Sequence, residues 1–425
     1  MRKTKINQWE PEVFDQLEFK NMRDVQEIIK EVRKKKDEAL KKFTLHYDHV
    51  KIDRFKVEKD EIRSAWSMVS QGLILCMEKA ARNLRKFSEK QRETFRDFDF
   101  EIEPGVLVGQ KAIPVKRVGI YVPGGRYPLI SSLIMASIPA RVAGVEQIMV
   151  CSPPSPGGKI HPAILAAARI CEVDEIYKVG GVQAIAAMAY GTQSIRRVDK
   201  IVGPGNKYVN AAKRIVYGQV GIDFIAGPTE LLIIADKDAN PSFLAADLIA
   251  QAEHDVNAVP MMATDSDELA SAVQDEIKKQ LCPLKTAEVA RKSLQKNGIL
   301  LILNSMDEAV EFANRRAPEH LQLSLNDAHS FLHRFKNYGS LFIGEYSPEG
   351  LGDYISGLNH ILPTNYASRY TGGLGVRNFI KTQTLLKVNK KGLLKIGPAA
   401  GSMAEAEGLE GHAHSIRIRM KRFCP

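Results

Sequence analysis

The chain has 425 residues, of which 44% are hydrophobic and 26% charged, values typical of a globular protein that can bury a core. The formal net charge is +10 at pH 7, but acidic and basic residues are interleaved over roughly the first hundred positions, which is typical of solvated helix faces rather than of a nucleic-acid surface. No apolar run is long enough to span a bilayer, the five cysteines form no Cys-x-x-Cys pair, and the basic N-terminus leads into polar sequence. We therefore expect a cytoplasmic protein without membrane or nucleic-acid partners.

Residues 1–114 predict mainly helices, because apolar residues recur at helical spacing in the charged segments 25–32 and 73–80. From Val115 onward, short apolar runs end in glycine or proline and are followed by helical segments. This alternation is typical of βα units on parallel sheets. The expected strands are 118–122, 147–150, 175–179 and 200–202, and, after Gly227-Pro228, 231–235, 258–263, 299–303 and 340–343.

The predicted fold class is α/β, with two Rossmann-like parallel-sheet domains that lack the usual glycine fingerprint, a helical N-terminal region and an extended C-terminal tail. Within the tail, the alternation of basic and apolar residues over 417–422 predicts an edge strand. The tail looks too thin to fold alone, and such tails often pack on a partner subunit. The expected parts are an N-terminal segment 1–20, a main domain 21–120 plus 230–374, a second domain 121–229 and a helical tail 375–425.

The glycine-ended strands indicate a nucleotide site, because ligands of parallel sheets lie beyond the carboxyl ends of the strands. Tyr121, Gln183 and Asn206 lie beside these glycines and could each hydrogen-bond a cofactor. The glycines could equally serve tight turns alone. Neither a Gly-x-Gly-x-x-Gly fingerprint nor a Walker A sequence is present, so the residues themselves leave both interpretations open.

Four segments place a carboxylate or an amide close to a histidine, a concentration that favours a metal-assisted active site. They are Gln251-Ala252-Glu253-His254, Ala317-Pro318-Glu319-His320, Gly352-Asp353 with Asn359-His360, and Glu407-Gly408-Leu409-Glu410-Gly411-His412. The amide and imidazole of the first segment are three residues apart and would share a helix face, and the histidine of the second could be a general base beside a carboxylate. Plainer interpretations exist for each: a coincidence of helix composition, a loop ion pair, an Asp that caps a turn, a core histidine, or surface residues.

With these segments in place, the chain resembles the histidinol dehydrogenase family over nearly its whole length. The resemblance is carried by Tyr121-Val122-Pro123-Gly124-Gly125, Gly203-Pro204-Gly205-Asn206, Ala226-Gly227-Pro228-Thr229-Glu230, the four segments above, and Glu405-Ala406 before the last of them. The resemblance implies a homodimer that uses NAD and one zinc ion per subunit. It implies four-electron oxidation of L-histidinol, through L-histidinaldehyde, to L-histidine, the last step of histidine biosynthesis.

The resemblance also implies roles for individual residues. Glu319 would activate water as acid and base, and His320 would be the general base that takes the alcohol proton. The implied zinc ligands are Gln251, His254, Asp353 and His412. The implied substrate contacts are Thr229, Gln251, His254, His320, Asp353, His360, Glu407 and His412, and the implied NAD contacts are Tyr121, Gln183 and Asn206. In the family the tail crosses to the partner subunit, the main domain carries most of the zinc site, and the second domain carries the NAD contacts.

Three segments differ from many members of the family: Leu129-Ile130-Ser131, Thr229 in place of serine, and Tyr370-Thr371-Gly372-Gly373-Leu374. Enzymes similar to histidinol dehydrogenase that oxidise other small alcohols, such as sulfopropanediol, share features of this kind. A relative that oxidises another small primary alcohol to its acid is therefore a second hypothesis. A third hypothesis is a catalytically silent basic protein that binds nucleic acid or a partner through its tail. The presence of Glu319, His320 and every implied metal position argues against this third hypothesis.

Overall fold

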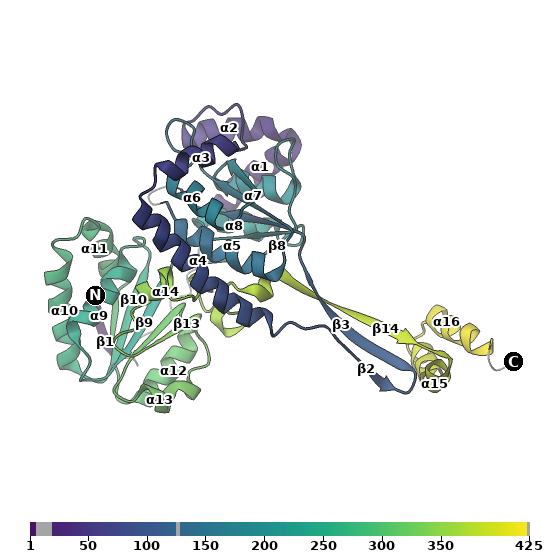
Figure 1. Ribbon diagram of the computed structural model, residues 1–425. Helices are drawn as coiled ribbons and strands as arrows, with labels where there is room; N and C mark the ends of the chain where they lie inside the picture. Colours follow the sequence, from purple (N-terminus) through teal and green to yellow (C-terminus); the bar gives the residue numbers. More distant parts are fainter. Residues whose placement is uncertain (6–18, 125–127, 423–425) are drawn as a thin grey trace. The chain divides into compact units, whose positions relative to one another are not determined.

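The computed structural model describes residues 1–5, 19–124 and 128–422 (Figure 1). The chain divides into two compact units. The first unit contains Met1–Lys90 and Val115–Phe379, and the second contains Gln91–Pro114 and Ile380–Pro425. None of the described helices is both long and apolar enough to cross a membrane.

The first unit contains a five-stranded, all-parallel sheet in the order β6-β5-β4-β7-β8. Its strands are β4 Arg117–Tyr121, β5 Gln147–Ser152, β6 Glu175–Lys178, β7 Lys200–Val202 and β8 Gly221–Ile222. The connecting helices are α5 Ile130–Ala143, α6 Pro162–Ile170, α7 Gly181–Tyr190 and α8 Lys207–Val216. The strand order reverses between β4 and β7, because β5 and β6 lie on one side of β4 while β7 and β8 lie on the other.

The N-terminal helices α1 Phe19–Lys35, α2 Asp37–Asp48 and α3 Lys59–Ser67 precede this sheet in the chain, and α4 Gln71–Arg92 follows them. The apolar face of α1, which includes Val25 and Val32, is buried in one core with residues of α7 and α8. Helix α3 contacts α6. The sequence grouped residues 21–120 with 230–374, whereas α1 packs with α7 and α8, α3 contacts α6, and β4 is a strand of the five-stranded sheet. Helical periodicity shows which face of a helix is buried, but it does not show which sheet will cover that face.

The first unit also contains a six-stranded, all-parallel sheet in the order β1-β11-β10-β9-β12-β13. Its strands are β1 Arg2–Lys5, β9 Glu230–Ala235, β10 Val259–Thr264, β11 Ile299–Ile302, β12 His320–Ser324 and β13 Ser340–Ile343. Its helices are α9 Pro241–Ala252, α10 Asp267–Leu281, α11 Ala287–Lys296, α12 Met306–Arg316, α13 Ala328–Phe331 and α14 Glu349–Tyr354, with short 3-10 turns at Leu332–Arg334, Ala367–Arg369 and Val376–Phe379.

Alternate residues of β9 enter two separate cores. Leu231 and Ile233 pack with α9, α10 and α11, whereas Leu232 and Ile234 pack with α12 and α13. This alternation follows from the two-residue period of a strand. Figure 1 shows the consequence: α10 and α11 cover one face of the sheet, and α12 and α13 cover the other.

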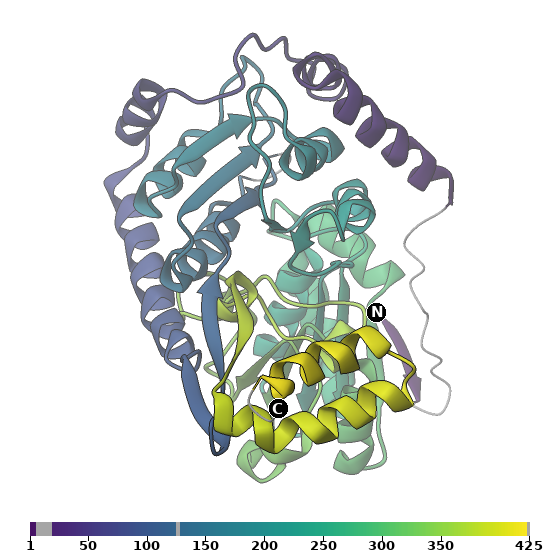
Figure 2. The ribbon, with the colours of Figure 1, turned by 90° about the vertical axis from the view of Figure 1, so that its right-hand side faces the viewer.

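The second unit consists of the antiparallel sheet β14-β3-β2 and a pair of helices. Its elements are β2 Phe98–Glu103, β3 Val106–Pro114, β14 Ile380–Val388, α15 Lys390–Ala406 and α16 Glu410–Lys421. Helices α15 and α16 lie side by side, drawn in yellow in Figure 2. The predicted mainly helical character of residues 1–114 was therefore incomplete, since β1, β2 and β3 are strands, and the predicted helical tail contains the long strand β14.

The predicted edge strand over residues 417–422 is wrong, because α16 continues to Lys421. Ala413 is buried, and the side chains of Ile416 and Met420 lie against Gly397 of α15. Positions 413, 416 and 420 have helical spacing, and Gly397 has no side chain to hold the two helices apart. The basic and apolar residues of this segment also alternate with a period of two, which is compatible with a strand. The packing against α15 favours the helix.

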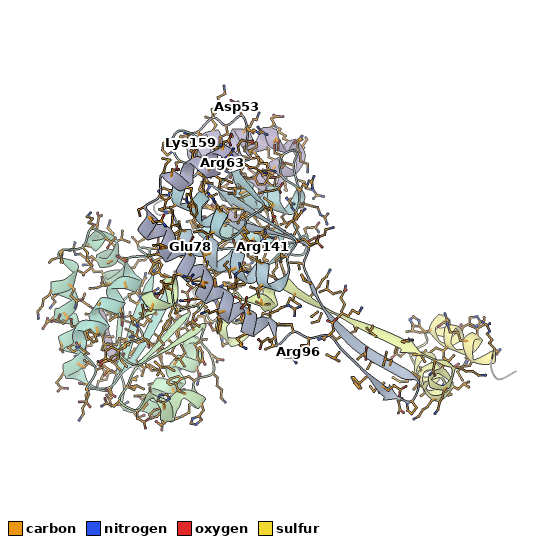
Figure 3. All side chains as sticks on the ribbon, in the orientation of Figure 1. Asp53, Arg63, Glu78, Arg96, Arg141 and Lys159 are labelled. Atoms are coloured by element: carbon orange, nitrogen blue, oxygen red, sulfur yellow. The ribbon has the colours of Figure 1, made fainter. Side chains whose placement is uncertain are left out.

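The charged residues of the first unit form interleaved pairs of opposite sign, as the sequence predicted for solvated helix faces. Glu31 on α1 accepts hydrogen bonds from Lys35 at 3.2 Å and from Lys42 at 2.9 Å. Arg63 on α3 and Lys159 between β5 and α6 are exposed, and both are labelled among the side chains of Figure 3. Exposed pairs of this kind contribute little to stability but keep the surface mixed in sign.

Candidate active site

The candidate active site is built at the amino ends of two neighbouring strands of the six-stranded sheet. Strands β9 and β12 are parallel, with Leu231 opposite His320. The residues that precede them are joined, because the Thr229 hydroxyl donates a hydrogen bond to Glu319 Oε2 at 2.6 Å. The backbone N–H of Glu230 donates to the same oxygen at 2.9 Å. Ligands of open α/β sheets usually bind at the carboxyl ends of the strands. This site therefore lies at the opposite edge of the sheet from the usual one.

Helix α9 runs back along the sheet from β9 to β10, so its last turn lies at the same amino edge. Gln251, in that turn, is fully buried, and its Nε2 donates to Thr229 Oγ1 at 2.9 Å. Gln251, Thr229 and Glu319 thus form one hydrogen-bonded chain. The Gln251 Oε1 atom has no hydrogen-bond partner among the described residues. His254 follows the end of α9 and has a side chain that is 44% exposed, with Nε2 3.9 Å from Asp353 Oδ2.

Helix α14 contributes two buried carboxyl groups, from Glu349 and Asp353. They are four residues apart and therefore lie on one face of the helix. Ligand atoms of His254, Glu349 and Asp353 all lie within 4.8 Å of one another, a spacing that suits a metal ion. Neither carboxyl oxygen of Glu349 has a hydrogen-bond partner among the described residues.

Sequence reasoning missed Glu349. Its signal was the spacing to Asp353, but Gly350 and Gly352 made the segment read as a glycine-rich turn rather than as a helix. Gly352 is required by packing, because a Cβ atom there would lie 2.5 Å from the ring of Phe342. The glycine thus lets α14 approach β13 closely, which brings both carboxyl groups to the sheet edge.

His320, the first residue of β12, is 3% exposed. Its Nδ1 lies 3.1 Å from the backbone oxygen of Glu230, and because a carbonyl oxygen only accepts hydrogen bonds, Nδ1 carries the hydrogen. The lone pair is then on Nε2, which is buried, has no hydrogen-bond partner among the described residues and lies 3.8 Å from Asp353 Oδ1. Burial lowers the pKa of His320 to about 4, because the imidazolium form would lose its hydration. The imidazole is therefore neutral near pH 7 and has the form of a general base.

The ionisable groups around this imidazole are mostly carboxyl groups. Burial raises the pKa of Glu319 well above its usual range, against the hydrogen bonds from Thr229 and Glu230, and the charge of Asp353 raises it further. Burial likewise raises the pKa of Glu349, and neighbouring carboxyl groups add to this effect. A cation bound among these groups would stabilise their ionised forms. With the unpartnered Gln251 Oε1 and the neighbouring imidazole nitrogens, the donor set of oxygen and nitrogen atoms fits a divalent metal ion such as zinc.

His360 lies beside this cluster and is engaged at both ring nitrogens. Its Nδ1 lies 2.7 Å from the backbone oxygen of Asp353, and its Nε2 lies 3.1 Å from the Ser132 hydroxyl on α5. This arrangement links α14 to the helix that follows β4. The histidine is thus hydrogen-bonded in this structure, as the plainer interpretation of the sequence allowed, and it borders the site.

The candidate cofactor residues lie at the carboxyl edge of the five-stranded sheet. Tyr121 ends β4, and its hydroxyl accepts a hydrogen bond from the backbone N–H of Gly181 at 3.1 Å. Burial raises the pKa of Tyr121 to about 12. Gln183 is buried in the first turn of α7. Asn206 follows β7 and caps α8, its Oδ1 accepting from the backbone N–H groups of Tyr208 and Val209. Tyr121 and Asn206 therefore flank the reversal of strand order, the position where doubly wound sheets bind their ligands.

The remaining candidate residues belong to the second unit. Glu407 is the C-cap of α15, and His412 lies in the first turn of α16. Both side chains are exposed. They are described within that unit alone.

The sequence profile of the family described as "Histidinol dehydrogenase" matches residues 15–420. A histidinol dehydrogenase of Methanocaldococcus jannaschii is 46% identical over 397 residues, which cover 93% of this chain and 92% of that protein. One of Bacillus cereus is 44% identical and covers 94% of this chain and 92% of its own length. The crystal structure of histidinol dehydrogenase from Elizabethkingia anophelis superposes with a TM-score of 0.93 at 38% identity, covering 100% of this chain and 98% of that one. The chain is therefore a dehydrogenase that belongs to the histidinol dehydrogenase family.

Proposed function

We propose that this protein oxidises L-histidinol, through L-histidinaldehyde, to L-histidine in two successive NAD-linked steps, as the last enzyme of histidine biosynthesis. Family membership supports the substrate and the reaction class. The observation that carries the proposal is the buried imidazole of His320, which is neutral, is held in one tautomer and has an unpartnered Nε2 that lies 3.8 Å from Asp353 Oδ1. A base in this state takes a proton from an alcohol without first losing one of its own.

The two candidate catalytic residues divide the reaction between them. His320 Nε2 takes the proton of the substrate hydroxyl as a hydride leaves the carbon that bears this hydroxyl. Glu319 takes a proton from water as the water oxygen adds to the aldehyde carbon, and the resulting hydrate anion loses a second hydride to give the acid. The hydrogen bonds from Thr229 and Glu230 oppose the rise in the pKa of Glu319 that burial causes, and a bound cation would further favour the ionised form that accepts this proton. NAD supplies the acceptor for each hydride.

We propose one zinc ion per subunit, held by Gln251, His254, Asp353 and the partner subunit's His412. The support is the unpartnered Gln251 Oε1 and the proximity of His254 to Asp353. When bound, zinc would supply a positive charge that anchors and orients the polar groups of the substrate. Glu349, which lies within the same cluster, would balance that charge from the protein side. Further substrate contacts are proposed for Thr229, Gln251, His254, His320, Asp353, His360, Glu407 and His412.

For NAD we propose contacts from Tyr121, Gln183 and Asn206, within a cofactor domain of residues 121–229. The position of these side chains at the carboxyl edge of the five-stranded sheet supports this assignment. The glycine-rich turn after β7 lacks the usual fingerprint, but Gly203 has a positive φ of 113° and approaches the backbone of Tyr121 closely. A side chain at this position would separate the two strand ends that carry the contacts.

We also propose a homodimer in which the second unit of each subunit packs on the other and contributes Glu407 and His412 to its site. The support is an apolar face on β2, where Phe98, Phe100 and Ile102 are 53%, 51% and 59% exposed. Phe98 and Phe100 alternate in the regular part of the strand and therefore share one face of the sheet, and Ile102 follows at a β-bulge. Contiguous apolar surface of this kind marks protein interfaces. A cytoplasmic location stays a prediction from the sequence.

The test is NADH formation by the zinc-loaded protein with L-histidinol, with histidine measured as the product. Two NADH per L-histidinol are expected for the wild-type protein. The variant Glu319→Gln keeps the shape of the side chain but cannot take a proton from water, so the ratio should fall toward one as aldehyde accumulates. The matched control is Glu311→Gln, which changes an exposed carboxyl on α12. No turnover of L-histidinol, together with turnover of sulfopropanediol or another small primary alcohol, would overturn the proposal and favour the second hypothesis.

A further inference from the structure

We propose that the buried ion pair Glu230–Arg316 is a positioning device that holds the two candidate catalytic side chains, Glu319 and His320, in register and sets the tautomer of His320. The inference rests on the catalytic roles proposed above. Among the described residues, the charged groups of Glu230 and Arg316 pair with each other, and Glu230 also accepts from Asn365, whereas the metal-ligand cluster is formed by other side chains. Both act through the groups that they orient.

The backbone of Glu230 contacts both members of the candidate catalytic pair. Its N–H donates to Glu319 Oε2 at 2.9 Å, and its carbonyl oxygen accepts from His320 Nδ1 at 3.1 Å. One residue therefore supplies a donor for the carboxyl group and an acceptor for the imidazole. A rotation of this short stretch of backbone would move both contacts together.

The side chain of Glu230 prevents such a rotation. Glu230 Oε2 pairs with Arg316 Nη2, and Glu230 Oε1 accepts from the backbone N–H of Asn365 at 2.8 Å. The two paired side chains are 1% and 4% exposed. The Arg316 guanidinium in turn lies over the ring of Tyr366, 4.8 Å from its centroid. The carboxylate is thus held from both sides, and its partner is held in a fixed plane.

The position of Arg316 in the chain explains why this pair controls the catalytic residues. Arg316 is the last residue of α12, and Glu319 follows three residues later. Between them, Ala317 adopts a left-handed conformation with φ 48° and ends the helix. The ion pair therefore ties the start of the turn that leads into β12 to the start of β9. The hydrogen bonds of the Glu230 backbone tie the end of the same turn.

A buried ion pair is a costly way to stabilise a fold, because the loss of hydration of both charges offsets most of their attraction. Its directional contacts specify one arrangement of the groups around it, which apolar packing does less well. Catalysis needs that arrangement, since a displacement of about 1 Å can cost about 100-fold in rate. The pair contacts Glu319 and His320 through the backbone of Glu230, and this positioning role explains why a costly ion pair is found here.

The test compares Glu230→Gln and Arg316→Lys with the wild-type protein, all loaded with zinc. Glu230→Gln keeps the shape of the side chain and removes the charge, and Arg316→Lys keeps the charge and loses the planar donor fork. We expect kcat to fall about 100-fold for Glu230→Gln and less for Arg316→Lys, with KM values for both substrates changed less than about threefold. The control is Arg117→Lys, which alters the Arg117–Glu175 ion pair of the five-stranded sheet.

A second readout does not depend on turnover. The ¹⁵N chemical shifts of the His320 ring, assigned by comparison with His320→Asn, report which nitrogen carries the hydrogen. We expect the Nδ1–H form in the wild-type and control proteins and a mixture of tautomers in Glu230→Gln. An unchanged tautomer together with kcat within about threefold of wild type would overturn the inference. If the wild-type protein does not oxidise L-histidinol, the proposed function fails, while the tautomer still tests the positioning role.

Discussion

Replacing Lys213 by methionine is expected to destabilise the protein strongly, because it leaves a buried carboxylate without its counter-charge. Lys213 on α8 pairs with Asp223 after β8, and both side chains are 1% exposed. The two groups also hold one residue between them. Lys213 Nζ donates to the backbone oxygen of Gly203 at 3.1 Å, and Asp223 Oδ2 accepts from the Gly203 N–H at 2.8 Å. The turn before Asn206 depends on both contacts.

The magnitude follows from this burial. Removing one member of a fully buried pair costs about 3–5 kcal/mol in free energy of unfolding, because the remaining carboxylate has no water and keeps only the Gly203 N–H and the more remote charge of Lys200. In the double variant Lys213→Met/Asp223→Asn no charge is left, and the asparagine oxygen can still accept from Gly203. Its cost should be near that of one lost neutral hydrogen bond, about 1 kcal/mol. The double variant should therefore be more stable than the single variant.

Urea denaturation measures both variants against the wild-type protein. With a denaturant slope of about 3 kcal/mol per molar or more for a chain of this size, the single variant should shift the midpoint by about 1 M, and the double variant by much less. A shift for Lys213→Met that corresponds to less than about 1 kcal/mol would refute the reasoning, and so would a double variant less stable than the single one. Either result would mean that water reaches Asp223.

Three further predictions concern pH, the hydroxyl at position 229 and the metal. Burial raises the pKa of Asp48 to about 6, so its carboxyl stabilises the fold when protonated, fully below about pH 4 and no longer once the pH has risen through 6. Asp48→Asn should therefore stabilise the protein at pH 8 by about 1–2 kcal/mol and should have no effect at pH 4. The magnitude is reduced because solvent screens this half-buried group. A gain in stability that does not depend on pH would contradict this prediction. Thr229→Val removes the hydroxyl that joins Gln251 to Glu319 and should cost about 1.5–3 kcal/mol by thermal denaturation, whereas Thr229→Ser keeps both hydrogen bonds and should cost less than about 1 kcal/mol. Zinc at about 100 times its dissociation constant should stabilise the protein by about 2.7 kcal/mol in thermal scans, a gain that a chelator and His254→Asn should each abolish; equal stabilisation of that variant would place the ion elsewhere.

Hydrophobic patterning was sufficient to predict most of the parallel strands. The expected strands 147–150, 200–202 and 340–343, for example, lie within β5, β7 and β13. Strand β12 was missed because the polar residues His320 and Gln322 alternate with its two leucines, although all of them are buried. A polar residue becomes compatible with burial only through partners that are remote in sequence, and here these are Glu230 and Asp247. Such partners cannot be identified from local pattern.

The candidate site was predictable in part for the same reason. Glu319 and His320 are adjacent in sequence, so their proximity needed no fold. The hydrogen-bonded chain from Gln251 through Thr229 to Glu319 could not be predicted in this way. It depends on the pairing of β9 with β12 and on the return of α9 to the amino edge. The sequence signal for the second unit was weak, because its strands β2 and β14 carry many exposed residues and no continuous apolar run.

The opposite edges used by the two parallel sheets have an electrostatic consequence. At the amino edge of the six-stranded sheet, α9 presents its carbonyl end beside Gln251, and the aligned peptide dipoles of a helix make that end negative. At the carboxyl edge of the five-stranded sheet, α8 begins at Asn206 with its amide end, which is positive. The first edge therefore favours cations and the second favours anions such as the phosphates of a dinucleotide. One chain with the same βα repeat thus offers two binding edges of opposite polarity, one suited to a metal ion and the other to a phosphorylated cofactor.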